Sequence, residues 1–501
     1  MATTIGQGNI LRSERIAGGI LPKVLNSFDM VAIFIVIVLW ISNAAVMTGA
    51  GPAAYVYWGL GFITFLMPGA VVTGQLGLMF PGEGSIYVWT TRAFGNFIGF
   101  LGGFCAWWPG ILALISGCVT AVSFIQKLGS LFGVPLLADP GSQGLVIILV
   151  ITFSFLLSVL RFRVTQNLVN IFFLTYGGAI LLIGLAGVLW LVTGHHPSVD
   201  MSFQRGGWLP SGGNLTFYGT VILGLLGIEV PLNMGVEIKD TGSITRYLLW
   251  GSIVVMVAYL IATFGVMVTV PLKEQGDLNA LIEAIKSGFG PIGLVLAALV
   301  DLIFIGYFIF AAAVYNYSYA RLIFVSGLDR RLPAVMSKVN SNRVPWVAVL
   351  VQSAIAALLS TVIYVLAPFV LPMPHTNDIS TIIYDILLGP TTIIWCLSMV
   401  ILFVDVIVIR HKYQDVFARI RLAPDWIFYL CAAVGAVTGM FGIYAIFTAP
   451  WTNLVTTGMW DAWIVGITGI SFVVAVGIFY IGQKTNESNI SDEDIIAEVT
   501  R

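Results

Sequence analysis

The chain has 501 residues, of which 58% are hydrophobic and only 9% are charged, with a net charge of −1. A soluble protein carries about 25% charged residues, and this charge balance gives no support for a nucleic-acid partner. The four cysteines lie in apolar runs and the four histidines lie in loops, so we expect no metal site and no cofactor. Apolar runs of about 20 residues recur from end to end, which predicts an all-α polytopic membrane protein.

The apolar runs predict about twelve membrane spans after a polar segment, residues 1–27, that does not resemble a cleavable signal peptide. In chain order the spans cover residues 28–50, 55–80, 95–125, 144–160, 165–193, 215–237, 247–271, 290–325, 345–368, 378–408, 425–448 and 461–482. The last residues, 483–501, are acidic and are expected to form a solvated cytoplasmic tail.

Basic residues divide unequally between the two sides of this arrangement. The side that holds both termini carries most of the Lys and Arg residues, whereas the other side carries only Lys127, Arg205, Lys273 and Lys286. Because cytoplasmic loops are enriched in Lys and Arg, we expect a multi-pass protein of the cell (plasma or inner) membrane with both termini in the cytoplasm.

Span one, residues 28–50, carries Ser42 and Asn43 near its middle. Both residue types favour helix N-caps over helix interiors. A second half-helix beginning at Ala44 would point its free N–H groups and its positive dipole end at the membrane centre, which suits a carboxylate. The alternative is an unbroken helix in which the two polar side chains bond back to the backbone.

Span six, residues 215–237, also contains residues that interrupt a helix. Gly224 and Gly227 are poor helix formers, and Pro231 cannot donate a backbone hydrogen bond to the preceding turn. Glu229 stands between them, where a lone carboxylate is costly in hydrocarbon. These residues predict two half-helices that meet where a small polar molecule binds. The alternative is a kink with a buried, hydrogen-bonded Glu229.

Spans one and six are five helices apart, so the second five spans enter the membrane in the opposite direction. This spacing predicts an inverted repeat of five plus five helices, with residues 28–193 and 215–408 as the repeats. Residues 425–482 then form two extra helices outside the repeat.

Three segments resemble signatures of the amino acid–polyamine–organocation superfamily. They are GQLGLMFPGEGSIYVWTTRAFG at residues 74–95, LGLLGIEVPLNMGVEIKD at residues 223–240, and YARLIFVSGLDRRLPAVMSKVNSNRVPWVAVL at residues 319–350. They resemble the second helix, the sixth helix, and the end of the eighth helix with the loop that follows. Two features depart from the superfamily: residues 40–47 lack its Gly-x-Gly pattern, and Gln75 stands where many members have Glu.

The resemblance implies a leucine-transporter-type core with a substrate site between spans one and six. The substrate carboxylate would take N–H groups near Ser42, Asn43, Ala44 and Ala45. The substrate amine would take carbonyl groups near Leu223, Gly224, Leu225 and Gly227. The nearest candidates for the side-chain pocket are Trp107 and Trp108 with Pro109, and either Tyr307 or Phe310, with ordinary core or lipid-facing aromatics as the alternative.

Three acids are expected inside spans: Glu229, Asp301 and Asp385. No basic residue lies at a similar depth, and acids in a bilayer usually face the bundle interior or a cavity. We therefore expect one of them to carry a proton, with Glu229 favoured because it adjoins the break and Asp301 next. The alternative is that all three are protonated structural acids.

Taken with the resemblance, the sequence predicts a secondary transporter rather than an enzyme, since no nucleophile–base or metal constellation is evident. It would move an amino acid or related amine by alternating access, as a proton-coupled symporter or an exchanger. Its partners would be that small molecule, protons and the lipid bilayer. The alternatives are an uncoupled facilitator or channel, and a sensor with the same fold.

Overall fold

The computed structural model describes residues 11–203, 207–211, 213–276, 278–370, 376–448, 450–451, 455–485 and 496–497. Most of the predicted tail, residues 483–501, therefore lies outside the described residues.

The described chain is almost entirely helical. Its helices are α1 (Arg12–Ile20), α2 (Ser27–Val38), α3 (Ser42–Met47), α4 (Ala53–Gly61), α5 (Met67–Met79), α6 (Ser85–Phe94), α7 (Asn96–Leu131), α8 (Pro140–Val159), α9 (Phe162–Val192), α10 (Thr216–Gly224), α11 (Gly242–Thr269), α12 (Ala280–Gly288), α13 (Gly293–Leu328), α14 (Trp346–Thr361), α15 (Ala367–Val370), α16 (Thr376–Lys412), α17 (Gln414–Arg419), α18 (Asp425–Ile446) and α19 (Thr457–Thr485). Within the described ranges, ten helices are long and apolar enough to cross a membrane, and the bent pair formed by α2 and α3 adds an eleventh. The run from α10 to Glu237 occupies the place of the remaining predicted span.

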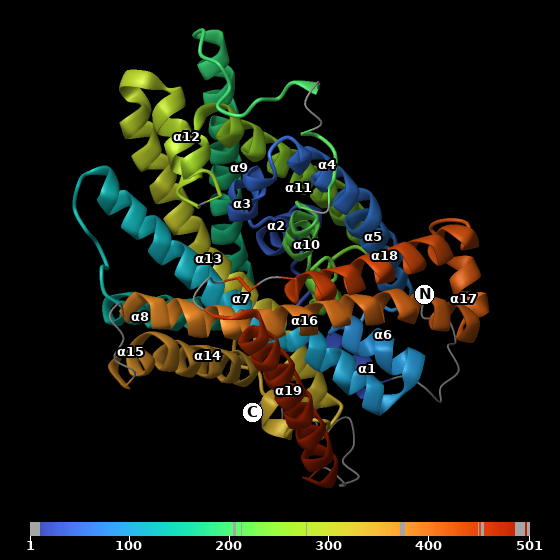
Figure 1. Ribbon diagram of the computed structural model, residues 1–501. Coiled ribbons are helices and arrows are strands. Elements are labelled where there is room, and N and C mark those ends of the chain that lie inside the picture. Colours follow the sequence, from blue (N-terminus) through green and yellow to red (C-terminus); the bar gives the residue numbers. More distant parts are fainter. Residues whose placement is uncertain are drawn as a thin grey trace.

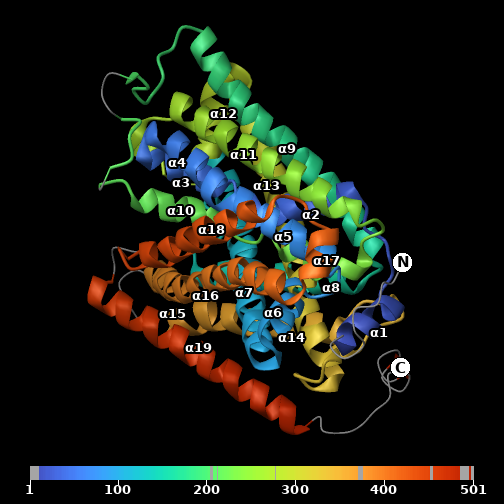
Figure 2. The same ribbon diagram turned by 90° about the vertical axis from the view of Figure 1, so that its right-hand side faces the viewer.

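The long helices run side by side, and α1 and the C-terminal end of α19 lie toward the same side of the bundle (Figure 2). The central helix α13 packs along α7 and also contacts α8, α9 and α14. Residues 311–328 of α13 are buried without interruption, so this half of the helix lies in the core (Figure 1). The helix α19 packs on α16 and α7 at the edge of the bundle.

The predicted break in span one is present. Helix α2 ends at Val38, α3 begins at Ser42, and the two axes are bent by 46°. The second half therefore begins two residues earlier than the expected Ala44. At the other end of α2, the Asn26 side chain accepts from the Asp29 N–H while Asp29 accepts from the Asn26 N–H, a reciprocal cap that fixes where the span starts.

Span six breaks more completely than the sequence predicts. Helix α10 ends at Gly224, and the chain continues through two 3₁₀ turns, Val230–Asn233 and Gly235–Glu237, instead of a second α-helical half. Gly227 has a φ of +95°, a conformation that side chains disfavour. Pro231 in the first turn has no N–H to continue an α-helix.

Glycines let span two approach span six closely. Helices α4 and α5 form one rod joined by a π turn at Phe62–Leu66, and Gly61, Gly69 and Gly77 lie along it. A Cβ added at these positions would stand 2.2, 2.5 and 2.6 Å from side chains of span six. Those side chains are Val221, Ile228 and Leu232, respectively. The two spans therefore touch along most of their length.

Candidate substrate site

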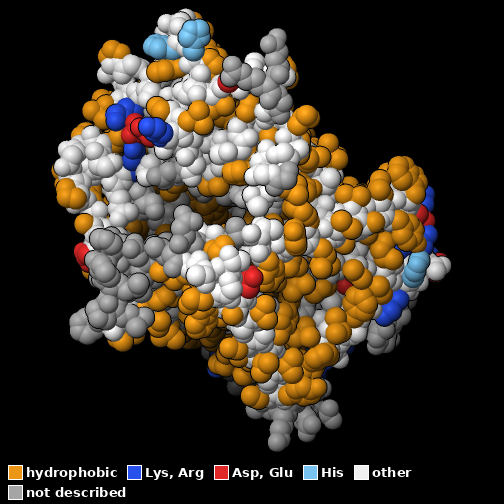
Figure 3. Space-filling view, in the orientation of Figure 1, with side chains coloured by type: hydrophobic (Ala, Val, Ile, Leu, Met, Phe, Trp, Pro, Cys, Tyr) orange, Lys and Arg blue, Asp and Glu red, His pale blue; other side chains and the backbone are white. Residues whose placement is uncertain are grey.

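A cavity of about 490 Å³ lies beside the two breaks. It is bordered by α2, α3, α7, α10, α13 and α16. The space-filling view shows the molecule hollowed near α3 and α7 (Figure 3). This face lies opposite α1 when the molecule is turned (Figure 2).

The cavity wall is aromatic and hydroxyl-rich. Its polar and aromatic lining residues are Trp40, Asn43, Ser116, Thr120, Thr220, Tyr315, Tyr384, Thr391, Thr392, Trp395 and Trp451. No charged side chain is among the described residues that line it. Ser116 of α7 and Tyr384 of α16 share a hydrogen bond across the wall. Such a wall suits a small molecule with an apolar body and a few polar groups.

Three of the predicted binding residues line the cavity: Asn43, Leu223 and Gly224. The Asn43 amide nitrogen lies 2.7 Å from the position that a Cβ on Gly224 would take, so α3 and α10 meet directly here. Ser42 is partly exposed at the start of α3.

The other predicted backbone positions lie behind the wall. Ala44, Ala45 and Leu225 are buried. Gly227 lies against Ile37 and Trp395.

The predicted aromatic residues lie away from this cavity. The Trp107 indole donates to the Gln352 side chain at 3.2 Å, and Trp107 lines a separate apolar cavity of about 340 Å³. Trp108 stacks on Phe104. Tyr307 is buried and stacks on Tyr176 with ring centroids 3.5 Å apart.

Of the candidates on α7, Pro109 does line the cavity, together with Leu112 of α7 and Tyr315 of α13. Phe310 stacks on Phe172 of α9. Leu112 lies about one helical turn beyond Trp108, and Tyr315 lies about two turns beyond Tyr307.

Three tyrosine hydroxyls hold the backbone at the break in span one. Tyr259 of α11 accepts from the Trp40 N–H at 2.9 Å, and Tyr176 of α9 accepts from the Ile41 N–H at 3.3 Å. Tyr315 of α13 has the carbonyl oxygens of residues 36 and 37 within 3.3 Å of its hydroxyl. The free backbone groups of a broken helix need such partners at membrane depth.

Glu229 lies buried below the cavity among other polar groups that have no partner. Both of its carboxyl oxygens lack a hydrogen-bond partner, as do the Tyr247 hydroxyl, the Tyr319 hydroxyl and the Trp395 indole N–H. Electrostatic interactions link Glu229 to all three side chains. The Trp395 indole lies close to the Glu229 carboxyl, but the geometry falls outside normal hydrogen bonding. Since Trp395 lines the cavity, it connects the substrate space to Glu229.

The remaining intramembrane acids lie elsewhere. Asp301 of α13 is buried and its carboxyl oxygens have no hydrogen-bond partner, but it does not line the cavity. Asp385 of α16 is half-buried. The expected total of three acids was wrong, because Asp405 of α16 is a fourth, fully buried and hydrogen-bonded by the Thr90 hydroxyl at 2.7 Å. Its position inside the apolar run ILFVDVIVI could have revealed it.

A buried cluster of charged residues closes the cavity on the side of α1. Arg321 of α13 donates from Nε to Glu237 at 2.8 Å. It also forms ion pairs with Glu237 at 2.7 Å and with Glu83 at 3.3 Å. All three side chains are at most 1% exposed. Burial raises the pKa of Glu83 well above its usual value, and the nearby Glu237 charge raises it further. Both effects favour the neutral form of Glu83 beside the Arg321–Glu237 ion pair.

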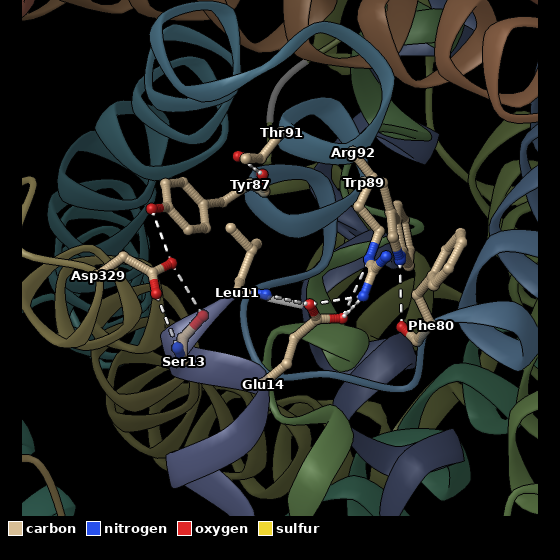
Figure 4. Close-up of polar contacts among 9 residues, drawn as sticks. All are labelled: Leu11, Ser13, Glu14, Phe80, Tyr87, Trp89, Thr91, Arg92 and Asp329. Carbon is tan, nitrogen blue, oxygen red and sulfur yellow. Dashed lines mark hydrogen bonds and ion pairs between the residues drawn. The ribbon is translucent and has the colours of Figure 1, made fainter. Parts of the chain in front are cut away.

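Helix α1 covers the same side with two polar contacts (Figure 4). The Ser13 N–H and hydroxyl donate to Asp329 at 2.7 and 2.9 Å, and the Tyr87 hydroxyl donates to the same carboxylate at 2.9 Å. Glu14 forms an ion pair with Arg92 at 2.7 Å. Because Tyr87 and Arg92 lie on α6 and Asp329 follows α13, α1 connects α6 with the end of α13. The cavity is thus open at one face and closed at the other.

Comparisons with known proteins agree with this architecture. The family described as amino acid permease matches residues 24–473. A probable agmatine/putrescine antiporter of Lactococcus lactis is 24% identical over 67% of this chain and 70% of its own length. The gamma-aminobutyric acid permease of Escherichia coli is 23% identical over 84% of this chain and 87% of its own length.

The fold also matches a solved structure of the manganese transporter of Eremococcus coleocola. The TM-score is 0.58 at 12% sequence identity, covering 96% of this chain and 98% of the transporter. At this identity the match shows the fold alone. The family match, which covers most of the chain, shows that this protein belongs to the amino acid permeases of the amino acid–polyamine–organocation superfamily, a family of transporters and not of enzymes.

Proposed function

We propose that this permease is a secondary transporter that moves a small amine or amino acid by alternating access, with the cavity of about 490 Å³ as its substrate site. The observation that carries the proposal is the asymmetry of this cavity. It borders two broken helices, it is open to one face, and the Arg321 cluster and α1 close it on the other. A ligand site that reaches only one side of the membrane at a time is what alternating access requires.

The orientation follows from the basic residues. The face that holds α1 and Arg92 carries most of the Lys and Arg of the chain, so it faces the cytoplasm. The cavity then opens to the outside of the cell membrane.

Glu229 is the residue that we propose as the proton carrier. It is the only acid among the described residues that adjoins both the break in span six and a cavity-lining side chain, Trp395. The groups that face it are Tyr247 from α11, Tyr319 from α13 and Trp395 from α16. All are neutral, so no fixed cation holds the carboxylate in its charged form. Gain and loss of a proton at Glu229 would therefore change the polarity of the site without breaking an ion pair.

The test uses the full-length protein in liposomes with an imposed proton gradient. Uptake of labelled agmatine, putrescine, gamma-aminobutyrate and common amino acids is measured with and without the gradient. Wild-type uptake should be saturable and stimulated by the gradient. Glu229→Gln should keep substrate binding and lose the stimulation, whereas the control Asp301→Asn should keep both.

Two outcomes would contradict this function. Gradient-stimulated uptake in Glu229→Gln would remove Glu229 from the coupling step. Uptake that responds to no ion gradient and to no substrate on the far side would identify an uncoupled facilitator.

A further inference from the structure

The backbone at the break in span one has few free N–H groups to offer a carboxylate. The Asn43 and Ala44 N–H groups donate to carbonyls within their own turn, each at 2.9 Å. Just before them, the Trp40 and Ile41 N–H groups donate to the hydroxyls of Tyr259 and Tyr176. Both tyrosines lie on other helices and are fully buried. The folded protein therefore already uses N–H groups that a substrate carboxylate would need.

The same tyrosine lies among three carbonyl groups that have spare acceptor capacity. Each carbonyl oxygen has two lone pairs, and the Val38 and Trp40 carbonyls each accept one backbone N–H, at 3.2 and 2.9 Å. The Tyr259 hydroxyl lies 3.1 Å from the Val38 carbonyl, 3.3 Å from that of Trp40 and 3.1 Å from that of Gly224. A hydroxyl has one proton to donate, so at any moment two of these three carbonyls receive nothing from it. Residues 38, 40 and 224 all line the cavity.

The side chains that line the cavity also offer no positive charge to a carboxylate. No Lys, Arg or His is among the described residues that line it. An ammonium group brings three donors and a positive charge. It would match the spare acceptor capacity of the carbonyls, whereas a carboxylate would meet side-chain donors of the wall, such as the Trp395 indole N–H, but no cation among the described lining residues.

We propose that Tyr259 and Tyr176 are specificity-determining residues that make this permease select amines without an α-carboxylate over the corresponding α-amino acids. This inference rests on the proposed transport function and narrows its substrate class. The amine would bind at the carbonyls of residues 38, 40 and 224, and its apolar chain would lie along the aromatic wall. Tyr259 sets the preference most strongly because it both blocks the Trp40 N–H and borders the amine position.

The experiment compares ligand pairs that differ only in the α-carboxylate: arginine with agmatine, ornithine with putrescine, and lysine with cadaverine. Uptake into liposomes that contain the full-length protein is measured for both members of each pair. We expect the amine of at least one pair to be taken up with a kcat/KM at least about tenfold higher than its parent amino acid, since one lost charge-assisted hydrogen bond is enough for that ratio.

The variants Tyr259→Phe and Tyr315→Phe separate selectivity from general damage. Tyr259→Phe leaves the Trp40 N–H with only the Val38 carbonyl, at 3.2 Å, as its acceptor, so a carboxylate can compete for it. The ratio of amine to amino acid uptake should then fall about tenfold or more, with the amino acid gaining in absolute terms. Tyr315→Phe removes a hydroxyl that contacts only carbonyls at residues 36 and 37. It should change uptake of both members alike and leave the ratio unchanged.

Each outcome has a separate meaning. Equal uptake of both members, or a preference for the amino acid, overturns the selectivity and leaves the transporter function standing. An unchanged ratio in Tyr259→Phe overturns the role of the tyrosine. Uptake of no member of any pair, and of no other amino acid or amine, overturns the transport function on which the inference rests.

Discussion

Replacing Arg321 by Met tests whether the buried charge cluster stabilises the closed face. The substitution leaves Glu237 and Glu83 in a site where both are at most 1% exposed. Burial and the charge of Glu237 already raise the pKa of Glu83 and favour its neutral form, so we expect Glu237 to be the one charge that loses its partner. Removing one partner of a buried ion pair costs about 3–5 kcal/mol, and we expect a loss in that range, not twice as much.

The free energy of unfolding is measured by denaturant titration in detergent micelles at neutral pH. The double variant Arg321→Met/Glu237→Gln should recover most of the loss, because it no longer buries an unpaired charge. Arg331→Met, which removes a half-buried arginine over the Phe479 ring, is the matched control and should cost less than about 1 kcal/mol. A loss below about 1 kcal/mol in Arg321→Met, or no recovery in the double variant, would refute the reasoning.

Three further predictions concern the same closure and the cavity. Burial raises the pKa of Glu83 well above 4.5, so the folded protein should be most stable while Glu83 keeps its proton and should lose stability as pH rises through that pKa. Thermal unfolding of Glu83→Gln should lack this loss of stability with rising pH. A wild-type pH dependence in the variant would contradict the assignment. Gly224→Val places a Cβ 2.7 Å from the Asn43 amide nitrogen, so uptake corrected for surface expression should fall about tenfold or more, and normal uptake would show that the cavity is not the substrate site. Glu14→Ala removes the ion pair to Arg92, so amide hydrogen exchange in α1 should speed up about tenfold or more; unchanged exchange would mean that the pair does not hold α1.

The break in span one could be predicted because its cause is local. Ser42 and Asn43 favour helix starts wherever they occur, and α3 begins at Ser42. The partners of the freed backbone could not be predicted in the same way. Tyr176 and Tyr259 lie 135 and 219 residues from the backbone groups that they bind, and only the packing of α9 and α11 against the break brings them there.

The three family-like segments were informative for a reason that the sequence alone does not show. The segment at residues 74–95 contains Glu83, the segment at 223–240 contains Glu237, and the segment at 319–350 contains Arg321. Each motif therefore supplies one member of the buried cluster. Spacing along the chain could not reveal this, because the members belong to different helices and turns that meet only in the folded protein.

The wall aromatics were the least predictable part of the site. Trp107, Trp108 and Tyr307 are the right residue types on the right helices, but each points at another neighbour. Which face of a long apolar helix meets a cavity depends on the rotation of the helix about its axis. In α7 and α13 nearly all faces are apolar, so hydrophobic periodicity carries little information about that rotation.

The contact between span two and span six determines how far a local movement travels. Gly61 and Gly77 are 16 positions apart, which corresponds to about 24 Å along a helix, and side chains of span six enter all three glycine positions over that length. Span two is a continuous stiff rod with no loop between its ends. We therefore expect a tilt of α10 at one end of this rod to be transmitted to its other end, which precedes Glu83.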